Sequence, residues 1–453
     1  MTLPGPLLSK LENIAGAAAI RLDATQRSAF AIDDCEPAVV VYPNTVAQAA
    51  ELVALAGRES MSLTPWGQGT QMHLGKAPIR YDLALSLAGL SRMLEYDEAN
   101  FTVTAEAGMP LREMHKTSLP KRQFLPLGFP GSMASLGGAL ATNTSGVKRL
   151  RYGGVRDLLL GVRVALPDGS LVHFGGRVVK NVAGYDMNKL FIGSLGAFGV
   201  ILEATYRLAA LPEDDRILAA VFPSVSQATQ AAAVIQASQL LPSAITLLST
   251  EAAAVCNLSF LLTAHDDQVV LCLNFDGMHE AVERQLHDSQ MVCEQHGSVS
   301  VAQISGEAML TLWEGQAAWR AAPNDVDQNR MQARLGILPS HITTVIQQIT
   351  APQRFCQQGG QWLADYSSGQ IFAHLPLDNP ETATHGEASG WLRNLRAQLR
   401  DGDGYCVIEY VPAILRRQLD IWGKSSGDQL LRLYKQHFDP HAVLNPGRYA
   451  AGL

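Results

Sequence analysis

The amino-acid sequence predicts an α+β protein built from two domains of different character. Short apolar strands alternate with helices up to residue 210, whereas longer Ala- and Gln-rich helices separate the strands beyond residue 215. The change falls at residues 211–215, where Leu-Pro-Glu-Asp-Asp interrupts both patterns. Three glycine-rich stretches in the first half are the candidate binding loops.

Composition restricts the class of protein. The 453 residues are 47% hydrophobic and 17% charged, which is typical of a globular chain of two or three domains. The net charge of −7 and the lack of a Lys/Arg block argue against nucleic acid as a partner. The sequence shows neither a signal peptide nor a run of ~18 apolar residues, so we expect no membrane span.

Six cysteines are scattered along the chain, and none belongs to a C-x-x-C pair. We therefore expect buried structural thiols rather than a disulfide framework or an iron–sulfur cluster. They are Cys35, Cys256, Cys272, Cys293, Cys356 and Cys406.

The first half begins with a strand, a helix and a second strand. Residues 38–42 are apolar throughout, as in a buried strand. Thr45 and Gln48 have the spacing of a capping box, in which side chains bind the free amides at the start of a helix. A short strand is expected at 61–65, immediately before the first glycine-rich stretch.

Further elements follow from the same patterns. In the first half we expect strands at 101–107 and 200–208, a helix whose first turn contains Pro110, and a hairpin of 162–166 with 171–174 around Pro167, Asp168 and Gly169. In the second half we expect helices at 226–241 and 278–296, strands at 268–275 and 370–375, and a last helix at 427–437.

The first glycine-rich stretch, residues 64–71, follows a predicted strand. Gly67 and Gly69 permit positive φ and close backbone approach, so that successive amides can point at an anion such as a diphosphate. The stretch is not the G-x-G-x-x-G fingerprint, because Met72 occupies the place of the third glycine, and it is not a Walker loop. A simple tight turn is the alternative interpretation.

The second and third stretches are less specific when taken alone. Residues 131–146 are rich in small and hydroxyl-bearing side chains and can begin a short helix near Gly137, with Ser135 at its cap, as an anion site; close packing is the alternative. The third comprises residues 151–157, 180–186 and 190–199, which could equally be surface loops with ion pairs.

In this order and spacing the three stretches resemble the FAD-binding domain of the vanillyl-alcohol oxidase/p-cresol methylhydroxylase family. Together with the tail from Asp439 to Gly447, they are similar to its glycolate oxidase/D-lactate dehydrogenase branch, and over nearly the full chain to the FAD-binding subunits of bacterial glycolate oxidases. The resemblance implies four parts: an N-terminal helical segment (1–31), a two-subdomain FAD-binding domain (32–211), an α+β cap domain for substrate or a partner (212–405), and a C-terminal segment (406–453) that packs on the FAD domain and returns to the flavin.

The resemblance also implies which residues bind FAD. The loop after the second strand would hold the pyrophosphate, the second stretch would line the cofactor, and residues near the C-terminus would close the site. The expected set is Trp66, Gly67, Gln68, Gly69, Thr70, Gln71, Pro126, Leu127, Ser135, Leu136, Gly138, Thr142, Asn143, Gly146, Gly199, Val200, Asn445 and Arg448.

Two departures from the family pattern affect the expected chemistry. Many relatives attach the flavin covalently through a histidine in or near the first loop, but residues 67–70 contain no His or Cys, so we expect non-covalent FAD. Catalytic members of the branch also carry metal-binding histidines and a Glu-His-Gly signature. This sequence has no Glu-His pair, and Pro440 separates His437 from His441, so we predict no metal.

The catalytic candidates are few. His374, on an apolar strand, is nominated as the base, although a hydrogen-bonded core histidine is the alternative. Arg320 and Arg334 are candidates to bind a substrate carboxylate in bidentate fashion, against ordinary packing or surface arginines.

The resemblance implies oxidation of a small 2-hydroxy acid, glycolate or D-lactate, to the 2-oxo acid by hydride transfer to FAD. The alternative is a non-catalytic flavin electron-transfer or structural subunit that supports a larger catalytic FAD subunit and an iron–sulfur subunit. A nicotinamide-dependent reductase is a third hypothesis. We expect a cytoplasmic location, either free or peripheral on the inner face of the cell membrane.

Overall fold

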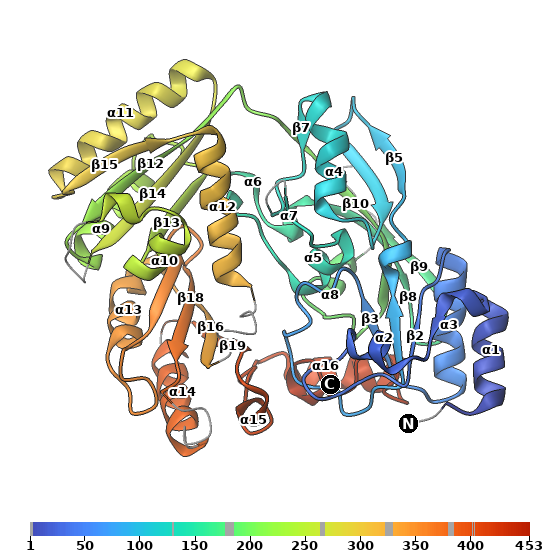
Figure 1. Ribbon diagram of the computed structural model, residues 1–453. Helices are drawn as coiled ribbons and strands as arrows, with labels where there is room; N and C mark the ends of the chain where they lie inside the picture. Colours follow the sequence, from blue (N-terminus) through green and yellow to red (C-terminus); the bar gives the residue numbers. More distant parts are fainter. Residues whose placement is uncertain are drawn as a thin grey trace. The chain divides into compact units, whose positions relative to one another are not determined.

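The computed structural model describes residues 3–128, 131–176, 185–262, 268–321, 329–378, 385–400, 402 and 404–453. The chain divides into two compact units, each assembled from separate pieces of sequence (Figure 1). Unit 1 comprises Met1–Ser145, Gly154–Ala210 and Lys424–Leu453, and unit 2 comprises Gly146–Gly153 and Leu211–Gly423. Of the expected motif at 180–186, residues 180–184 lie outside the described residues.

Unit 1 contains two main sheets, one for each of the two subdomains. The first has the order β1 (Ile20–Arg21), β2 (Val39–Val41), β4 (Leu83–Ser86) and β3 (Leu63–Trp66), with β2 and β3 both parallel to β4. The second is antiparallel and has the order β5 (Met93–Asp97), β6 (Thr102–Glu106), β10 (Val200–Arg207), β8 (Leu159–Ala165) and β9 (Leu171–Gly175). A short pair joins β7 (Gln123–Phe124) to β11 (Ala209–Ala210).

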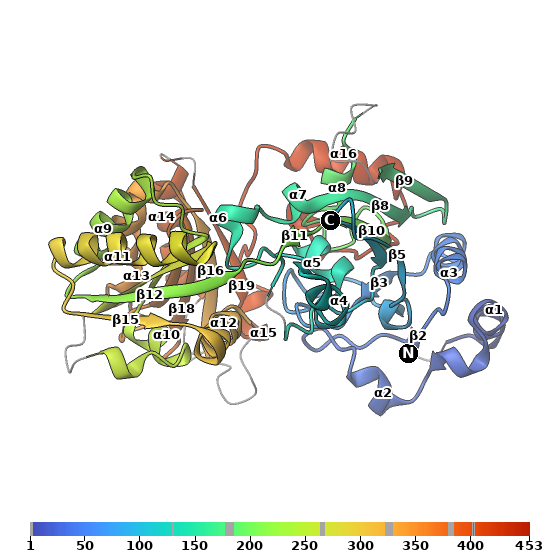
Figure 2. The ribbon, with the colours of Figure 1, turned by 90° about the horizontal axis from the view of Figure 1, so that it is seen from above.

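Helix α3 (Val46–Arg58) shows how local sequence determines structure in unit 1. Thr45 is its N-cap, and the hydroxyl accepts the amide of Gln48 at 3.1 Å. The Gln48 side chain accepts the amide of Asn44 at 2.9 Å, one residue before the partner that a capping box predicts. The apolar face of α3 packs on the four-stranded sheet and beside α1 (Gly5–Ala15), and both ribbon views show the two helices together (Figures 1 and 2).

The other helices of unit 1 are short. They are α2 (Ala24–Ser28), α4 (Leu111–Ser118), α5 (Leu136–Thr142), α7 (Val155–Leu158), α8 (Asn188–Phe191) and α16 (Asp428–Phe438). Pro110 is the N-cap residue of α4 and therefore precedes the first turn, in which it was expected to lie.

Unit 2 is built on one eight-stranded antiparallel sheet. Its order is β15 (Ser300–Ile304), β12 (Asp214–Phe222), β14 (Val269–Gly277), β13 (Ala244–Leu248), β17 (Gln361–Asp365), β18 (Gln370–Pro376), β16 (Arg330–Gly336) and β19 (Tyr405–Tyr410). One face carries α9 (Val225–Ala237), α11 (His279–Gln295), α13 (Ile342–Thr350) and α14 (His385–Arg400) over the main core. The other carries α10 (Thr250–Val255) and α12 (Gly306–Arg320) (Figure 2). The short helices α6 (Arg149–Tyr152) and α15 (Ala413–Arg416) complete the unit.

Strand β19 falls almost entirely within residues 406–453, which were expected to pack on the FAD-binding domain. Its pairing with β16 places it in the sheet of unit 2, and the chain rejoins unit 1 only at Lys424. No helix in the described part of the chain is both long enough and apolar enough to cross a membrane.

Segment Gly146–Gly153 is held in unit 2 by buried ion pairs rather than lying in a solvated loop. Lys148 Nζ contacts Asp276 Oδ2 at 2.8 Å and also binds Asp215. Arg151 Nη1 contacts Asp276 Oδ1 at 2.6 Å, and the Tyr152 hydroxyl donates to Asp276 Oδ2 at 2.9 Å. Because the Asp276 side chain is fully buried, these donors are needed to offset the loss of its hydration.

Candidate functional site

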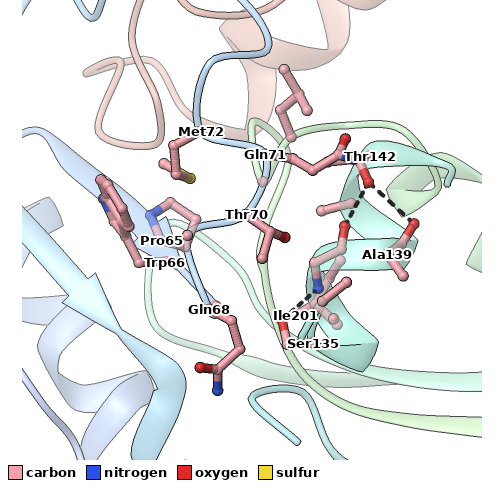
Figure 3. A pocket seen from close by; sticks show the side chains of 18 of the residues that line it. Pro65, Trp66, Gln68, Thr70, Gln71, Met72, Ser135, Ala139, Thr142 and Ile201 are labelled. Carbon is pink, nitrogen blue, oxygen red and sulfur yellow. Dashed lines mark hydrogen bonds between the residues drawn. The ribbon is translucent and has the colours of Figure 1, made fainter. Parts of the chain in front are cut away.

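Unit 1 contains a pocket between the glycine-rich loop that follows β3 and the start of α5 (Figure 3). Together with the open solvent at its mouth, the empty space of the pocket is about 780 Å³. Segments far apart in the sequence form its walls: residues 65–72, residues within 134–144, residues 195 and 196, and residues 445 and 448, with Leu87, Ala107 and Ile201 between them.

The loop of residues 67–71 supplies free main-chain donors. Within the described part of the chain, none of its amides donates to a protein acceptor. Gly69 has φ +75°, so the chain turns there through the left-handed region. Free amides in a turn of this kind form an anion-binding concavity, which fits the predicted pyrophosphate site.

The N-terminus of α5 does not supply such donors, which differs from the sequence-based expectation. Ser135 is the N-cap, and its hydroxyl accepts the amide of Gly138 at 3.1 Å. The amides of Leu136 and Gly137 donate to the main-chain carbonyls of Met109 and Ala107 at 2.9 and 2.8 Å, just after β6. Since the first three helix amides are already bonded, α5 shapes the pocket but leaves anion binding to the loop.

Close contact between the two walls requires glycine. A Cβ on Gly67 would stand 2.1 Å from the Ser135 hydroxyl oxygen, and one on Gly137 would stand 2.6 Å from the Cβ of Ala107. Such distances are far below van der Waals contact. The loop can therefore approach the start of α5 to this degree only because Gly67 has no side chain, and α5 can lie this close to Ala107 only because Gly137 has none.

The start of the loop is fixed by a buried aromatic group. Trp66 Nε1 donates to the Tyr81 hydroxyl at 2.6 Å, and that hydroxyl donates to the Phe30 carbonyl at 2.9 Å. Burial raises the pKa of Tyr81, so the phenol stays protonated and continues to donate. The indole consequently has one fixed position where β3 ends and the loop begins.

The C-terminal turn adds to the outer edge of β3. The amide of Leu63 donates to the carbonyl of Val443 at 2.7 Å, and the amide of Asn445 donates to the carbonyl of Leu63 at 2.9 Å. The Asn445 side chain lines the pocket and donates through Nδ2 to the carbonyl of Leu195. Its Oδ1 is buried without a hydrogen-bond partner, so it is available to an N–H or O–H group of a bound cofactor.

Arg448 holds the chain that follows the loop. Its Nη2 donates to the carbonyls of Met72 and Leu74 at 2.8 and 2.6 Å, and the residue is buried at the pocket wall. The guanidinium therefore fixes the exit of the loop and adds positive charge beside a site for an anion. Free amides, an unsatisfied Asn445 oxygen and a buried cation together fit the diphosphate and polar atoms of FAD.

The structure brings many of the predicted cofactor residues together. The pocket is lined by Trp66, Gly67, Gln68, Gly69, Thr70, Gln71, Ser135, Gly138, Thr142, Asn445 and Arg448. In Figure 3, Gln68, Thr70 and Gln71 extend from the loop, and Ser135, Ala139 and Thr142 belong to the facing wall.

The remaining predicted residues do not line the pocket. Pro126, Leu127, Leu136, Gly199 and Val200 are buried elsewhere in unit 1, Asn143 is exposed at the C-cap of α5, and Gly146 belongs to unit 2. The stretch 190–199 instead contributes Gly196, which has φ +76° and whose Cβ would stand 2.6 Å from Pro65 Cγ. The regular glycine spacing pointed to this stretch but did not identify the member that reaches the pocket.

Comparison with known proteins identifies the class of cofactor. Residues 37–175 match the family model "FAD binding domain", and residues 211–345 match "FAD linked oxidases, C-terminal domain". The chain belongs to the FAD-linked oxidases. Its cofactor is FAD, and it is an FAD-dependent oxidoreductase.

Relatives of this FAD-linked oxidase are similar over nearly the whole chain. Glycolate oxidase subunit GlcD of Bacillus subtilis is 26% identical over 92% of this chain and 89% of its own length. D-2-hydroxyglutarate dehydrogenase of Xanthomonas citri is 27% identical over 91% of this chain and 89% of its own length. A crystal structure of p-cresol methylhydroxylase with substrate bound has a TM-score of 0.76 at 15% identity, covering 100% of this chain and 98% of that one, which shows a shared fold.

The catalytic candidates of the oxidase lie in unit 2. Arg334 is on β16 and His374 on the adjacent β18, and Arg320 is the last residue of α12. The Arg320 guanidinium lies 4.4 Å from the ring centre of Phe372, which is paired with Arg334 across the two strands. Arg334 Nε lies 2.9 Å from Glu409 Oε1, so this arginine is committed to an ion pair.

His374 has the environment of a core residue. It is buried, and its ring stacks on Trp319 at 4.0 Å between centroids with an angle of 10°. Its Nε2 lies 2.8 Å from the carbonyl oxygen of Trp319 and 3.0 Å from the side-chain nitrogen of Gln332, so both of these neighbours belong to the core. Burial, assisted by the charge of Arg330, lowers the pKa of His374 to about 3. A general base works best with a pKa near the working pH, so this environment favours the core interpretation.

Replacing Gly69 by Asp should abolish FAD retention. The new carboxylate would stand beside the free amides of the loop and repel the diphosphate, in addition to the strain at φ +75°. Gly69→Ala is the matched control, because it introduces the strain without the charge and should retain more FAD. The flavin-to-protein ratio of each purified variant measures the effect. A normal ratio in folded Gly69→Asp would show that the loop does not hold the diphosphate.

Replacing His374 by Phe should make the free energy of unfolding less sensitive to low pH. The folded pKa is about 3 against 6.5 for an exposed histidine, so the unfolded chain binds the extra proton. The stability that His374 contributes is complete above pH 6.5 and is lost as the pH falls towards 3. At pH 5 the loss is about 2 kcal/mol. Phenylalanine keeps the stacking and does not titrate. Urea unfolding should show that, between pH 7 and pH 5, the free energy of unfolding falls by about 2 kcal/mol less in the variant than in the wild type. Equal decreases in the two proteins would mean that His374 titrates normally.

Proposed function

We propose that this FAD-linked oxidase converts a small 2-hydroxy acid, glycolate or D-lactate, to the corresponding 2-oxo acid. The proposal is supported by relatives whose names refer to glycolate, D-lactate and D-2-hydroxyglutarate and which match about nine-tenths of the chain. The observation in the structure that carries it is the state of Arg320, a cation without a committed partner on the sheet of unit 2.

Arg320 and Arg334 differ in their availability. Arg334 is engaged by Glu409. Arg320 forms no hydrogen bond or ion pair with the described residues, and its Nε is buried without a partner. Burial lowers the pKa of Arg320, with Asp365 and Glu409 opposing the shift, but a guanidinium remains protonated in proteins. A substrate carboxylate would supply the missing acceptors, so Arg320 is the preferred binding residue.

Each part of the chain has a defined task in this proposal. FAD, when bound, supplies the acceptor for hydride from the substrate α-carbon. The loop of residues 67–71 holds the cofactor by its diphosphate, and Arg320 orients the substrate through its carboxylate. His374 is a poor acceptor for the hydroxyl proton, because its Nε2 already contacts Trp319 and Gln332 and its pKa is about 3.

The state of His374 also supports a second candidate function. In this alternative the chain is an electron-transfer or structural flavin subunit, and substrate is oxidised on a larger FAD subunit that passes electrons on to an iron–sulfur subunit. The Bacillus relative is itself named as a subunit, which supports a multisubunit context. Isolation of the untagged chain with its partners, followed by measurement of flavin and iron content, would show whether such subunits are present.

We further propose that FAD is held without a covalent bond. The residues lining the described pocket include no histidine or cysteine that could form the usual attachment. Acid precipitation of the holoprotein should therefore release the yellow colour into the supernatant. Flavin that stays with the pellet would show a covalent link.

Glycolate or D-lactate should bleach the visible flavin absorbance of the purified chain under anaerobic conditions. Arg320→Met should raise the substrate concentration for half-maximal reduction by at least about tenfold, since a charged hydrogen bond is worth ~1.5–3 kcal/mol. Arg354→Met is the control, because the Arg354 side chain is 88% exposed and is paired with Glu387 of α14.

Three outcomes separate the hypotheses. Bleaching that depends on Arg320 supports oxidation by this chain. No bleaching by the chain alone, but reduction after addition of partner subunits, supports the electron-transfer alternative. Bleaching by NADPH but not by hydroxy acids would instead indicate a nicotinamide-dependent reductase.

A further inference from the structure

A buried lysine lies behind the cofactor pocket of unit 1 without lining it. Lys435 is on α16, and its Nζ donates to the carbonyl of Ala197 at 2.6 Å and to that of Leu444 at 2.7 Å. It also forms an ion pair with Asp439 Oδ2 at 2.7 Å. An ammonium group has three N–H donors, so each of them has one acceptor here.

The partner carboxylate is equally well satisfied. Asp439 Oδ1 accepts the amide of Val443 at 2.8 Å, and Oδ2 accepts the amide of Leu444 at 2.9 Å. Burial lowers the pKa of Lys435, and the charge of Asp439 opposes that shift. Taking both charges out of water is expensive, and an apolar pair of similar volume would often stabilise a fold as well. The benefit of the pair must therefore be sought in the geometry that it imposes.

The three acceptors of Lys435 belong to two segments that each supply residues to the pocket wall. Ala197 directly follows Gly196, which lines the pocket, and Leu444 directly precedes Asn445, which lines it from the other side. The same two segments are joined in front by the hydrogen bond from Asn445 Nδ2 to the carbonyl of Leu195. Lys435 thus fixes from behind the distance between two segments that are about 250 residues apart in sequence.

We propose that Lys435 is a positioning residue for the cofactor: its ammonium holds the turn at 195–197 and the C-terminal turn at 439–445 in the arrangement that binds FAD. The inference rests on FAD occupying this pocket. Loss of the ammonium should leave the two turns free to separate, so that the unsatisfied Asn445 oxygen no longer meets the cofactor at a fixed place.

The test compares Lys435→Met with Gln436→Met, which introduces the same residue at the next, exposed position of α16. The FAD dissociation constant of the apoprotein is measured by fluorescence, and the melting temperature is measured with and without saturating FAD. Lys435→Met should raise the dissociation constant at least about tenfold, or ~1.4 kcal/mol, and should reduce the FAD-induced rise in melting temperature. Gln436→Met should change neither quantity.

A merely structural role gives a different result. In that case Lys435→Met lowers the melting temperatures of the apoprotein and holoprotein equally and leaves the dissociation constant unchanged, which would overturn the proposal. If unpaired Asp439 prevents folding, the double variant Lys435→Gln with Asp439→Asn keeps polar donors without charge, and the same two measurements apply to it. Failure of the wild-type chain to bind FAD would instead refute the cofactor assignment.

Discussion

The arrangement of unit 1 depends on main-chain N–H groups that the fold leaves without partners. A bound diphosphate needs several such donors at one place, and regular secondary structure normally consumes them. The amides at the start of α5 are used internally, whereas those of residues 67–71 are not. The loop must therefore lie open to the pocket, and its glycines follow from the need to place bare main chain against Ser135 and Trp66.

The pocket is complete only when the C-terminal residues have returned to unit 1. Asn445 extends the edge of β3, and Arg448 fixes the chain that leaves the loop. An edge strand with unpaired main-chain groups invites such an addition. Because the chain passes through the whole of unit 2 before it reaches Lys424, formation of the FAD site depends on segments from both ends of the sequence. The buried Lys435–Asp439 pair stabilises the last part of that closure.

Sequence patterns predicted the parts of the fold that local interactions determine. The cap of α3, the hairpin of β8 and β9, and the loop after β3 depend on residues within a few positions of one another. All three are present, although Gln48 binds the amide of Asn44 rather than that of Thr45. The eight-stranded sheet was only partly foreseen, because the pairing of β13 with β17 and of β16 with β19 joins distant segments. No local pattern encodes such pairing.

The same distinction holds for the site. Residues 66–71 line the pocket together, because one continuous loop presents them. The roles of Gly196 and Gly199 could not be separated from sequence, since only the fold shows which glycine meets Pro65. Lys435 was not singled out at all, because a lysine on a C-terminal helix is ordinarily a surface residue and its buried acceptors are carbonyl groups of remote segments.

The electrostatics of unit 2 decide which arginine can serve a substrate. Burial raises the pKa of Glu409, and the charges of Arg334 and then Arg320 oppose that shift. Of the two arginines, Arg334 is the one in ion-pair contact with this carboxylate, through its Nε at 2.9 Å. Asp365 is occupied by the hydroxyls of Ser367 and Ser368 at 2.7 and 2.6 Å, and it acts on Arg320 only through its field. Within the described part of unit 2, the charge of Arg320 therefore has no ion-pair partner and lies above the ring of Phe372. A single carboxylate, as in glycolate or D-lactate, balances it.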